Sequence, residues 1–168
     1  MFYRLACAGA LALFVTAGNA AAAAGNNDIT FMDPASEYNT LALNVDGSHN
    51  VLTIAQAAPQ APSDGNLMDV SLTGNFNGGM GDFTGAALIS GLTPGLLSQD
   101  GVGNRMSLTV MGSHNLFAMV QNGSANVIDG HISGVGNQAA VVQNGAGNHF
   151  SFSQSGIGNI INISQTSW

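Results

Sequence analysis

Asparagine and glutamine, which carry side-chain amides, are the residues whose spacing in this sequence most directly suggests a chemical role. In the stretch QNGAGNHFSFSQSGIGN, Gln143 is followed eleven residues later by Gln154, and Asn148 is followed eleven residues later by Asn159. An amide carries both hydrogen-bond donors and an acceptor, so amides stacked at a regular interval can bond to one another. A buried amide is costly unless it is bonded, and a ladder of amides satisfies every member.

The asparagine spacing divides the chain into ten short units. Their first residues are Asn39, Asn50, Asn66, Asn77, Asn104, Asn115, Asn126, Asn137, Asn148 and Asn159. A glycine stands three residues before most of these asparagines, including Gly112, Gly123, Gly134, Gly145 and Gly156. Because glycine reaches positive φ without strain, we expect a tight turn at the start of each unit.

Each unit continues with alternating apolar and polar residues, which is the period of a strand with one buried face. The apolar residues occupy mainly the second, fourth and sixth positions after each asparagine. The segments are too short and too closely bounded by glycine to be helices. The predicted inward core of the later units consists of Leu108, Phe117, Met119, Ile128, Val141, Phe150, Phe152, Ile161 and Ile163.

The sixth position shows that the units alternate in type. Even-numbered units carry Gln56, Phe83, Gln121, Gln143 and Gln165 there, whereas most odd-numbered units carry Val, Leu or Ile, with Gln154 in the ninth. The true repeat is therefore 22 residues, or two strands. Two insertions, at residues 57–62 and 85–100, are expected to fall between pairs of strands. The predicted amide-ladder residues are Asn104, Asn115, Gln121, Asn126, Asn137, Gln143, Asn148, Gln154, Asn159 and Gln165.

This pattern predicts an all-β solenoid, a cross-β stack of five strand–turn–strand rungs over residues 39–168. The two strands of a rung should face each other across about 10 Å, and successive rungs should stack at about 4.7 Å. Like residues would then lie above like residues. A stack of this kind ends in unpaired strands, and edges without lysine, proline or bulges favour the addition of another chain.

The first residues have the pattern of a secretory signal peptide. Arg4 provides a positive start, residues 5–17 are apolar, and small residues offer cleavage after Ala20 or Ala24. We therefore expect residues 1–24 to be a leader and the protein to be secreted. Cys7 is the only cysteine and lies in this leader, so the remaining chain would have neither disulfides nor thiolate metal sites.

Composition argues against several classes of partner. The formal net charge is −7, and Arg105 is the only strong base after the leader. Such a chain lacks the basic footprint of nucleic-acid-binding proteins and the polybasic clusters that bind anionic lipid. No serine, histidine and aspartate belong to a recognisable catalytic motif, and no phosphate or dinucleotide loop is present. We expect neither catalysis nor a cofactor.

A few residues allow two interpretations. His49 and His114 lie in similar GSHN turns, but without a fixed pair spacing they are expected to be solvated imidazoles rather than metal ligands. Asp69, Asp129 and Gly130 are candidates for residues that slow self-assembly. For the two aspartates the alternative is a solvated outer face. Trp168 either covers the last rung or extends into solvent.

The repeats resemble those of the curlin family, whose pattern is approximately S-x5-Q-x-G-x-x-N-x-A-x3-Q. The segments QNGAGNHFSFSQ and QSGIGNIINISQ match it, and GVGNQAAVVQ includes the alanine of the pattern, Ala139. The resemblance covers roughly residues 39–165 and is strongest in the last three pairs. It departs from the family at the opening serine, which is often asparagine, and at Gly79 and Gly81 in the second pair.

The resemblance implies a fibre subunit of curli, the extracellular amyloid of biofilms. Such a protein would be exported through an outer-membrane pore, with residues 25–38 as its export segment, and would polymerise with copies of itself on a second, nucleating curlin. Two alternatives stay open: the protein is the minor, nucleating subunit, or it is a secreted β-solenoid adhesin or binding module that does not polymerise.

Overall fold

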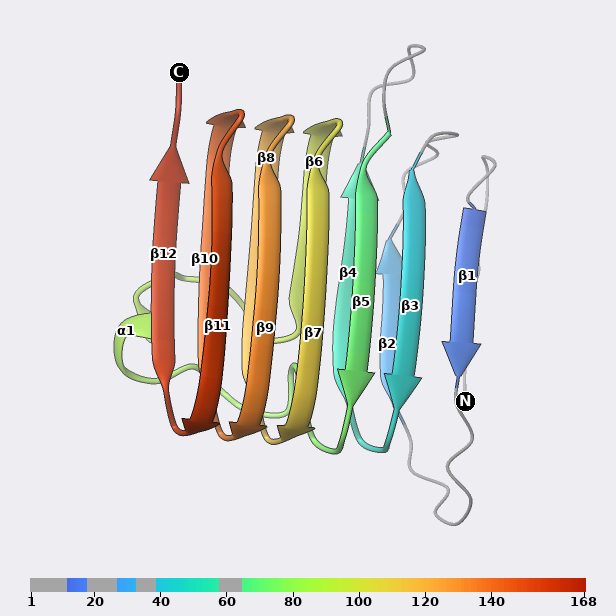
Figure 1. Ribbon diagram of the computed structural model, residues 1–168, viewed down its shortest axis with the longest axis vertical. Helices are drawn as coiled ribbons and strands as arrows, with labels where there is room; N and C mark the ends of the chain where they lie inside the picture. The colour runs from blue at the N-terminus through green and yellow to red at the C-terminus, as the bar shows by residue number, and fades with distance from the viewer. Residues whose placement is uncertain (1–11, 18–26, 33–38, 58–64) are drawn as a thin grey trace.

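The computed structural model describes residues 12–17, 27–32, 39–57 and 65–168, and it consists of two parallel six-stranded sheets. The first sheet contains β1 (Ala12–Ala17), β3 (Thr40–Asp46), β5 (Leu67–Thr73), β7 (Arg105–Ser113), β9 (Val127–Val135) and β11 (His149–Ile157), in this order. The second contains β2 (Asp28–Met32), β4 (Val51–Ala57), β6 (Leu96–Val102), β8 (Leu116–Ser124), β10 (Gln138–Ala146) and β12 (Ile160–Thr166). Figure 1 shows the strands side by side along the stack.

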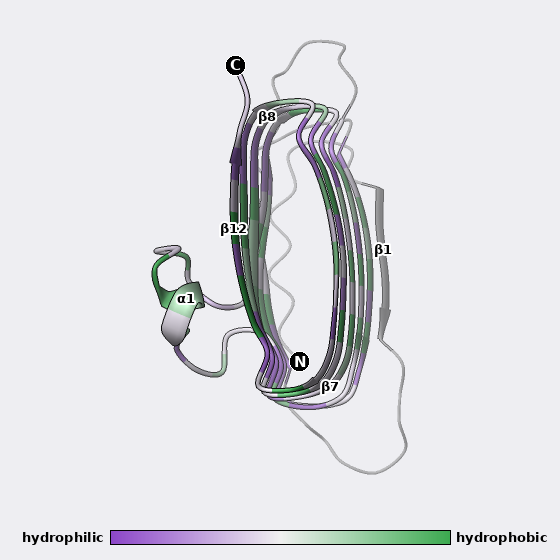
Figure 2. Ribbon diagram, turned by 60° about the vertical axis from the view of Figure 1, so that its left-hand side comes forward, coloured by the Kyte–Doolittle hydropathy of each residue, from purple (hydrophilic) through white to green (hydrophobic). Residues whose placement is uncertain are grey.

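The two sheets face each other, and the chain passes from one to the other at every turn. We call a pair of consecutive strands, one from each sheet, a rung; β9 and β10 form one such pair. Viewed nearly along the stack, the rungs superpose as a flattened ring (Figure 2). In the later rungs each residue pairs with the residue 22 positions on, as Phe117 does with Ala139 and Ala139 with Ile161. The predicted all-β solenoid with a 22-residue repeat is confirmed.

The stack begins one turn earlier than predicted. Strand β1 lies within the expected leader and pairs with β3, while β2 lies within the expected export segment and pairs with β4. The count of five rungs was therefore wrong by one turn. It rested on the apolar pattern after each asparagine, and Ile29 and Phe31 continue that inward pattern in a unit that starts at Asn27. The assignments of leader and export segment themselves stay predictions.

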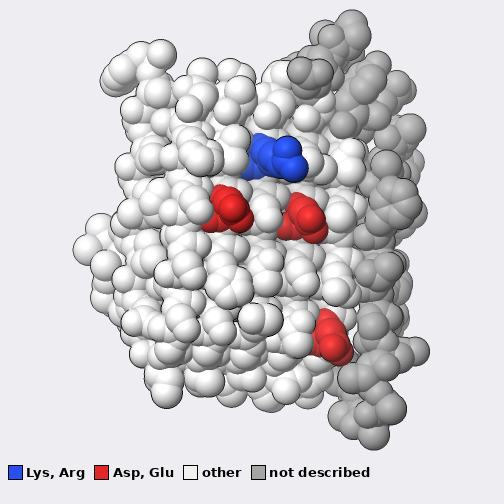
Figure 3. All heavy atoms as spheres, viewed as in Figure 1, with Lys and Arg blue, Asp and Glu red and all other residues white. Residues whose placement is uncertain are grey.

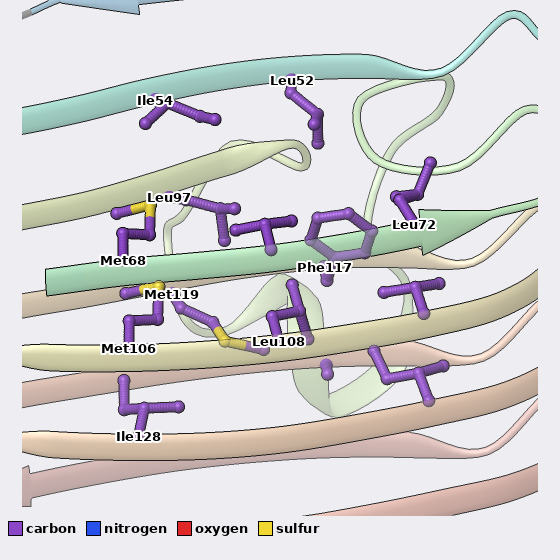
Figure 4. Packing of buried hydrophobic residues seen from close by; sticks show 14 of the residues in the cluster. Leu52, Ile54, Met68, Leu72, Leu97, Met106, Leu108, Phe117, Met119 and Ile128 are labelled. Carbon is purple, nitrogen blue, oxygen red and sulfur yellow. The ribbon is translucent and has the colours of Figure 1, made fainter. Parts of the chain in front are cut away.

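The core is one continuous cluster of apolar side chains between the sheets, and similar positions of successive rungs lie above one another in it (Figure 4). Leu108, Phe117, Met119, Ile128 and Val141 are all buried in it, as predicted. In the last rung Phe152 is buried, and Phe150, Ile161 and Ile163 are partly buried against the same core. Burial decreases there because no further rung covers these side chains.

The second insertion lies elsewhere than predicted. After a single bridged residue, Gly78 opposite Val51, the chain leaves the second sheet. It returns at Gly95, whose backbone N–H donates to the Phe117 carbonyl, and continues as β6. The insertion therefore spans residues 79–94 and interrupts a strand, whereas 85–100 was expected to separate two pairs. Only glycine allows this exit, because a Cβ on Gly95 would lie 2.8 Å from the backbone nitrogen of Gly79.

The inserted segment covers part of the outer face of the second sheet. It contains the short helix α1 (Gly85–Leu88), which lies outside the ring in Figure 2. Phe83, predicted as an inward strand residue, is instead buried with Ala87 against Ala118 and Ala140 on this outer face. Among the described residues, no helix is long and apolar enough to cross a membrane.

Replacing a turn glycine should be far more damaging at one turn position than at the next. At Gly134, where φ is 123°, an added Cβ would overlap the carbonyl oxygen of Gly156 in the following rung. We expect Gly134→Ala to lower the free energy of unfolding by about 3 kcal/mol or more. The control is Gly136→Ala, because φ there is 68° and nothing lies within 4 Å, so about 1 kcal/mol is expected. Urea unfolding followed by circular dichroism measures both, and equal losses would contradict this account of the turn.

Candidate functional site: amide ladders and the ends of the stack

Two columns of asparagines run along the stack, one at each bend of the ring, and all their members except Asn27, Asn148 and Asn159 are buried. One column is Asn39, Asn66, Asn104, Asn126 and Asn148, and the other is Asn27, Asn50, Asn77, Asn115, Asn137 and Asn159. In the later rungs, from Asn104 onward, each asparagine immediately precedes a strand and follows a glycine-containing turn. The turn directs its side chain inward, onto the asparagine of the preceding rung.

The hydrogen bonds in these columns have a fixed direction. The backbone N–H and Nδ2 of Asn126 both donate to Oδ1 of Asn104 in the preceding rung, at 3.1 and 3.0 Å. Nδ2 of Asn126 also donates to the carbonyl oxygen of Gly145, in the next turn at the same bend, at 2.9 Å. The Asn104 side chain thus pairs the backbone N–H of Asn126, and the Asn126 side chain pairs its own Nδ2 hydrogens and the carbonyl of a turn. Leaving any of these groups unpaired would cost about 1–3 kcal/mol.

A column of glutamines in the second sheet performs a related role. Nε2 of Gln121 donates to Oε1 of Gln143 in the following rung and to the Arg105 carbonyl across the rung, both at 3.0 Å. The column is Gln56, Gln99, Gln121, Gln143 and Gln165, each bonded to the next. These amides therefore link successive rungs and also join the two sheets within a rung.

Nine of the ten predicted ladder residues join a column of amides, and Gln154 does not. It lies in the first sheet, 22 residues after Ile132, which occupies the same place in the preceding rung. Its Nε2 donates to the Gln138 carbonyl at 3.0 Å, but its buried Oε1 accepts no bond. The amide-to-amide bonding expected for Gln154 was wrong, because that column otherwise holds aliphatic side chains.

Two ladder members, Asn27 and Gln99, lie at none of the repeat positions identified from the sequence. Gln99 replaces Phe83 at the sixth position, and it could have been found because it precedes Asn104 by five residues, as Gln121 precedes Asn126. Asn27 accepts from the backbone and side chain of Asn50 and donates to the Gly47 carbonyl, as later asparagines do. Asn27 lies 23 residues before Asn50, one residue more than the repeat, so a fixed spacing does not find it.

The direction of the bonds makes the two ends of the stack chemically different. At the C-terminal end, Oδ1 of Asn148 and Oδ1 of Asn159 accept no hydrogen bond from any described residue. In every earlier rung this oxygen accepts from the asparagine of the following rung. An asparagine at the opposite end presents donors towards a preceding rung. The ends are therefore complementary, acceptor to donor.

Strands β11 and β12 form the last edges of the two sheets. They contain no lysine, arginine, aspartate, glutamate or proline, so nothing in their composition opposes a further strand. Ser167 partly covers one bend, since its hydroxyl accepts from Nδ2 of Asn148 at 3.0 Å. Trp168 is fully exposed, which excludes a role in covering the last rung.

The remaining candidates lie on the outer surface. His49, Phe76 and His114 stack through their rings at 4.8 and 5.0 Å, each from a turn residue with positive φ. No cluster of three metal-binding side chains occurs in the described ranges. Asp69 and Asp129 are exposed two rungs apart on the first sheet, on either side of Ser107. Figure 3 shows how few charges this face carries.

Gly130 has a packing role that its position on a strand did not reveal. An added Cβ would lie 2.7 Å from the ring of Phe152 and 3.2 Å from Cδ1 of Leu108. The missing side chain therefore makes room for the large ring in the next rung.

Comparisons with protein-family models, with curated proteins and with solved structures find no match.

Breaking the glutamine column at its centre should destabilise the whole stack. Gln121→Met keeps the side-chain size but removes the glutamine donor of Gln143 Oε1, the acceptor of Gln99 Nε2 within the column and the side-chain bond to the Arg105 carbonyl, while Gln99 Nε2 keeps its bond to the Leu67 carbonyl. We expect a loss of about 3 kcal/mol in the free energy of unfolding. The matched control is Asn122→Ala, which removes an exposed amide bond to Asn144 and should cost less than about 1 kcal/mol. If chemical denaturation gave the same midpoint for both variants, the buried column would not be a main source of stability.

Proposed function

We propose that the protein is a secreted structural subunit that polymerises end to end into an extracellular amyloid-type fibre, as its resemblance to curlins implies. The observation that carries the proposal is the complementarity of the two ends. Asn148 and Asn159 offer unused Oδ1 acceptors at one end. In a second copy stacked in register, Asn39 and Asn50 would supply the backbone and Nδ2 donors that these oxygens lack.

The glutamine column supports the same register. Nε2 of Gln165 already donates to the His149 carbonyl and has a second hydrogen to donate. Oε1 of Gln56 accepts no bond from another described residue, whereas each later member of the column accepts from the glutamine before it. A second copy would therefore bring Oε1 of its Gln56 to Nε2 of Gln165. With this contact the column would continue through the junction.

The N-terminal strands limit where a second copy can add. In this register β11 and β12 of one copy would meet β3 and β4 of the next. Strand β1 pairs with the outer edge of β3. Removal of a leader over residues 1–24 would free that edge of β3. Strand β2 occupies the edge of β4, where Asn27 uses the donors of Asn50. We infer that β2 competes with the incoming copy and has to leave this edge.

The wider setting of the function follows from the resemblance alone. The partners would be further copies of the same chain, a second curlin subunit and a curli-type outer-membrane pore, and the fibre would lie at the cell surface. The role of minor, nucleating subunit is the alternative within the same family. A protein that remains a soluble monomer would instead be a secreted binding module built on the same solenoid.

The direct test is assembly of residues 25–168 after dilution from denaturant. We expect a lag followed by growth in thioflavin T fluorescence, and a meridional reflection at about 4.7 Å in fibre diffraction. A concentrated sample that remains monomeric, with the circular dichroism of a strand-rich protein, would overturn the fibre proposal and leave the solenoid intact.

The acceptor at the end of the stack should matter for assembly more than for folding. Asn159→Ala removes the oxygen that would receive the next copy's Asn50, and within the copy it removes the Nδ2 bonds to Asn137 and Ser155. Each junction would lose about 1.4 kcal/mol, so the critical concentration for fibre formation should rise roughly tenfold. Asn144→Ala is the control, because its outward side chain accepts only from Asn122. Sedimentation at equilibrium gives the critical concentrations, and an unchanged value for Asn159→Ala would contradict the proposed junction.

Removing β2 should accelerate growth. In residues 33–168 the edge of β4 is free, so the step in which β2 leaves is absent. We expect seeded elongation several times faster than for residues 25–168 at equal monomer concentration, measured by thioflavin T fluorescence on the same seeds. Slower elongation of the shorter chain would show that β2 contributes to the junction rather than competing with it.

A further inference from the structure

The inserted segment, residues 79–94, extends along the stack towards its C-terminal end. It leaves the second sheet between β4 and β8 and then lies over the later strands, with α1 against β10 and β12. A Cβ added to Gly85 would lie 3.1 Å from Cδ1 of Ile160, the first residue of the edge strand. Figure 1 shows α1 projecting past β12, on the side where a further rung would add.

The segment is held firmly on the sheet. The backbone N–H of Thr84 donates to Oε1 of Gln138 at 2.8 Å, and Nε2 of Gln138 donates to Oγ1 of Thr84 at 2.7 Å. Phe83 and Ala87 are buried against Ala118 and Ala140. Alanine at these two outward positions lets the segment lie close to the sheet.

Two apolar residues at the C-terminal end of α1 are uncovered. Leu88 is 64% exposed and Ile89 is 82% exposed. These residues belong to a segment that is fixed to its own sheet and lies against the edge strand. Exposed apolar residues at such a place are typical of a contact surface. We call Leu88 and Ile89 the overhang.

Sheet register identifies what the overhang would meet. The outward column beneath the insertion contains Ala118 and Ala140, and it ends with Asn162 on β12. The register-equivalent residue of β4 is Thr53, which pairs with Leu96, the neighbour of Ala118 in the same column. In the preceding outward column the equivalent residue of β4 is Val51. Both are partly exposed, small and uncharged.

Strand β2 would be a poorer match at the same place. Its outward residues include Asp28, which occupies the column of Val51. An approach to β2 would bring a carboxylate under Leu88 and Ile89 and remove it from water without a partner. The chemistry of the overhang therefore favours β4.

We infer that the overhang is an interaction surface for a second copy of this chain, docking on the outer face of that copy's β4 at Val51 and Thr53. The inference rests on the proposed end-to-end assembly and adds a contact outside the two sheets. Each junction would then be held by the strand edges and also by the overhang. The contact would favour copies that carry the insertion over solenoids that lack it.

Disulfide trapping tests the contact. The variant Ile89→Cys with Thr53→Cys is prepared in residues 25–168, which contain no other cysteine. Within one copy α1 lies against β10 and β12, which are three and four strand positions from β4, or roughly 14 and 19 Å. A disulfide is therefore expected only between copies. The control is Ile89→Cys with Asn44→Cys, which places the second cysteine on the exposed outer face of the first sheet. Circular dichroism before assembly confirms that both variants fold.

We expect the Thr53 pair to give covalent oligomers on oxidation of fibres, at least fivefold more than the Asn44 pair. Fibres that form normally but yield equal crosslinking in both variants would overturn the overhang contact and leave the proposed fibre function standing. If no fibres form from the unmodified chain either, both proposals fall.

A kinetic measurement checks the same contact without cysteines. Leu88→Ser with Ile89→Ser changes only exposed side chains, so the unfolding midpoint should be unchanged. We expect seeded elongation to slow by roughly tenfold. Met111→Ser, at an exposed methionine on the first sheet, should elongate at the normal rate. Equal rates for the two variants would contradict the inference.

Discussion

The whole structure depends on satisfying buried amides and backbone groups by hydrogen bonds along the stack. Each asparagine of the interior rungs receives bonds from the next rung and supplies one to a turn carbonyl, as Asn126 does with Asn148 and Gly145. A rung by itself would leave these groups unpaired in a narrow apolar interior, where each would cost about 1–3 kcal/mol. Stacking removes this cost for interior rungs and transfers it to the ends. The same interaction therefore explains both the regularity of the repeat and the chemical difference between its ends.

The turns and the core follow from this constraint. Rungs can stack closely only if the turn has no side chain at the glycine position, because the carbonyl of the next turn occupies that space. The inward side chains then lie in columns and have to complement one another in size, as Gly130 does for Phe152. Outward residues are less constrained in size. The insertion lies where the small outward residues Ala118 and Ala140 leave room for it.

The ends of the molecule connect structure to the proposed function. At the C-terminal end an uncharged edge with unused acceptors is bordered by the exposed side chains of α1. At the other end β2 occupies the place of a further strand beside β4, and Asn27 is the last member of the asparagine column. In a chain with these two ends, the short strand β2 would block the edge at which another copy adds. Assembly would then be governed by how readily that strand is replaced.

Local repetition allowed the sequence by itself to determine the repeat length, the strands, the inward core and nine of the ten predicted ladder residues. Side-chain alternation and glycine position are local properties, and stacking simply repeats them. Only the tertiary structure decided which residues complete the irregular rung. Counting six residues from Asn77 selected Phe83, whereas close approach of Gly79 and Gly95 lets the chain leave the sheet and Gln99 enter the column. It also decided that β1 and β2 extend the stack and that α1 reaches its end, because such contacts join segments whose separation follows no period.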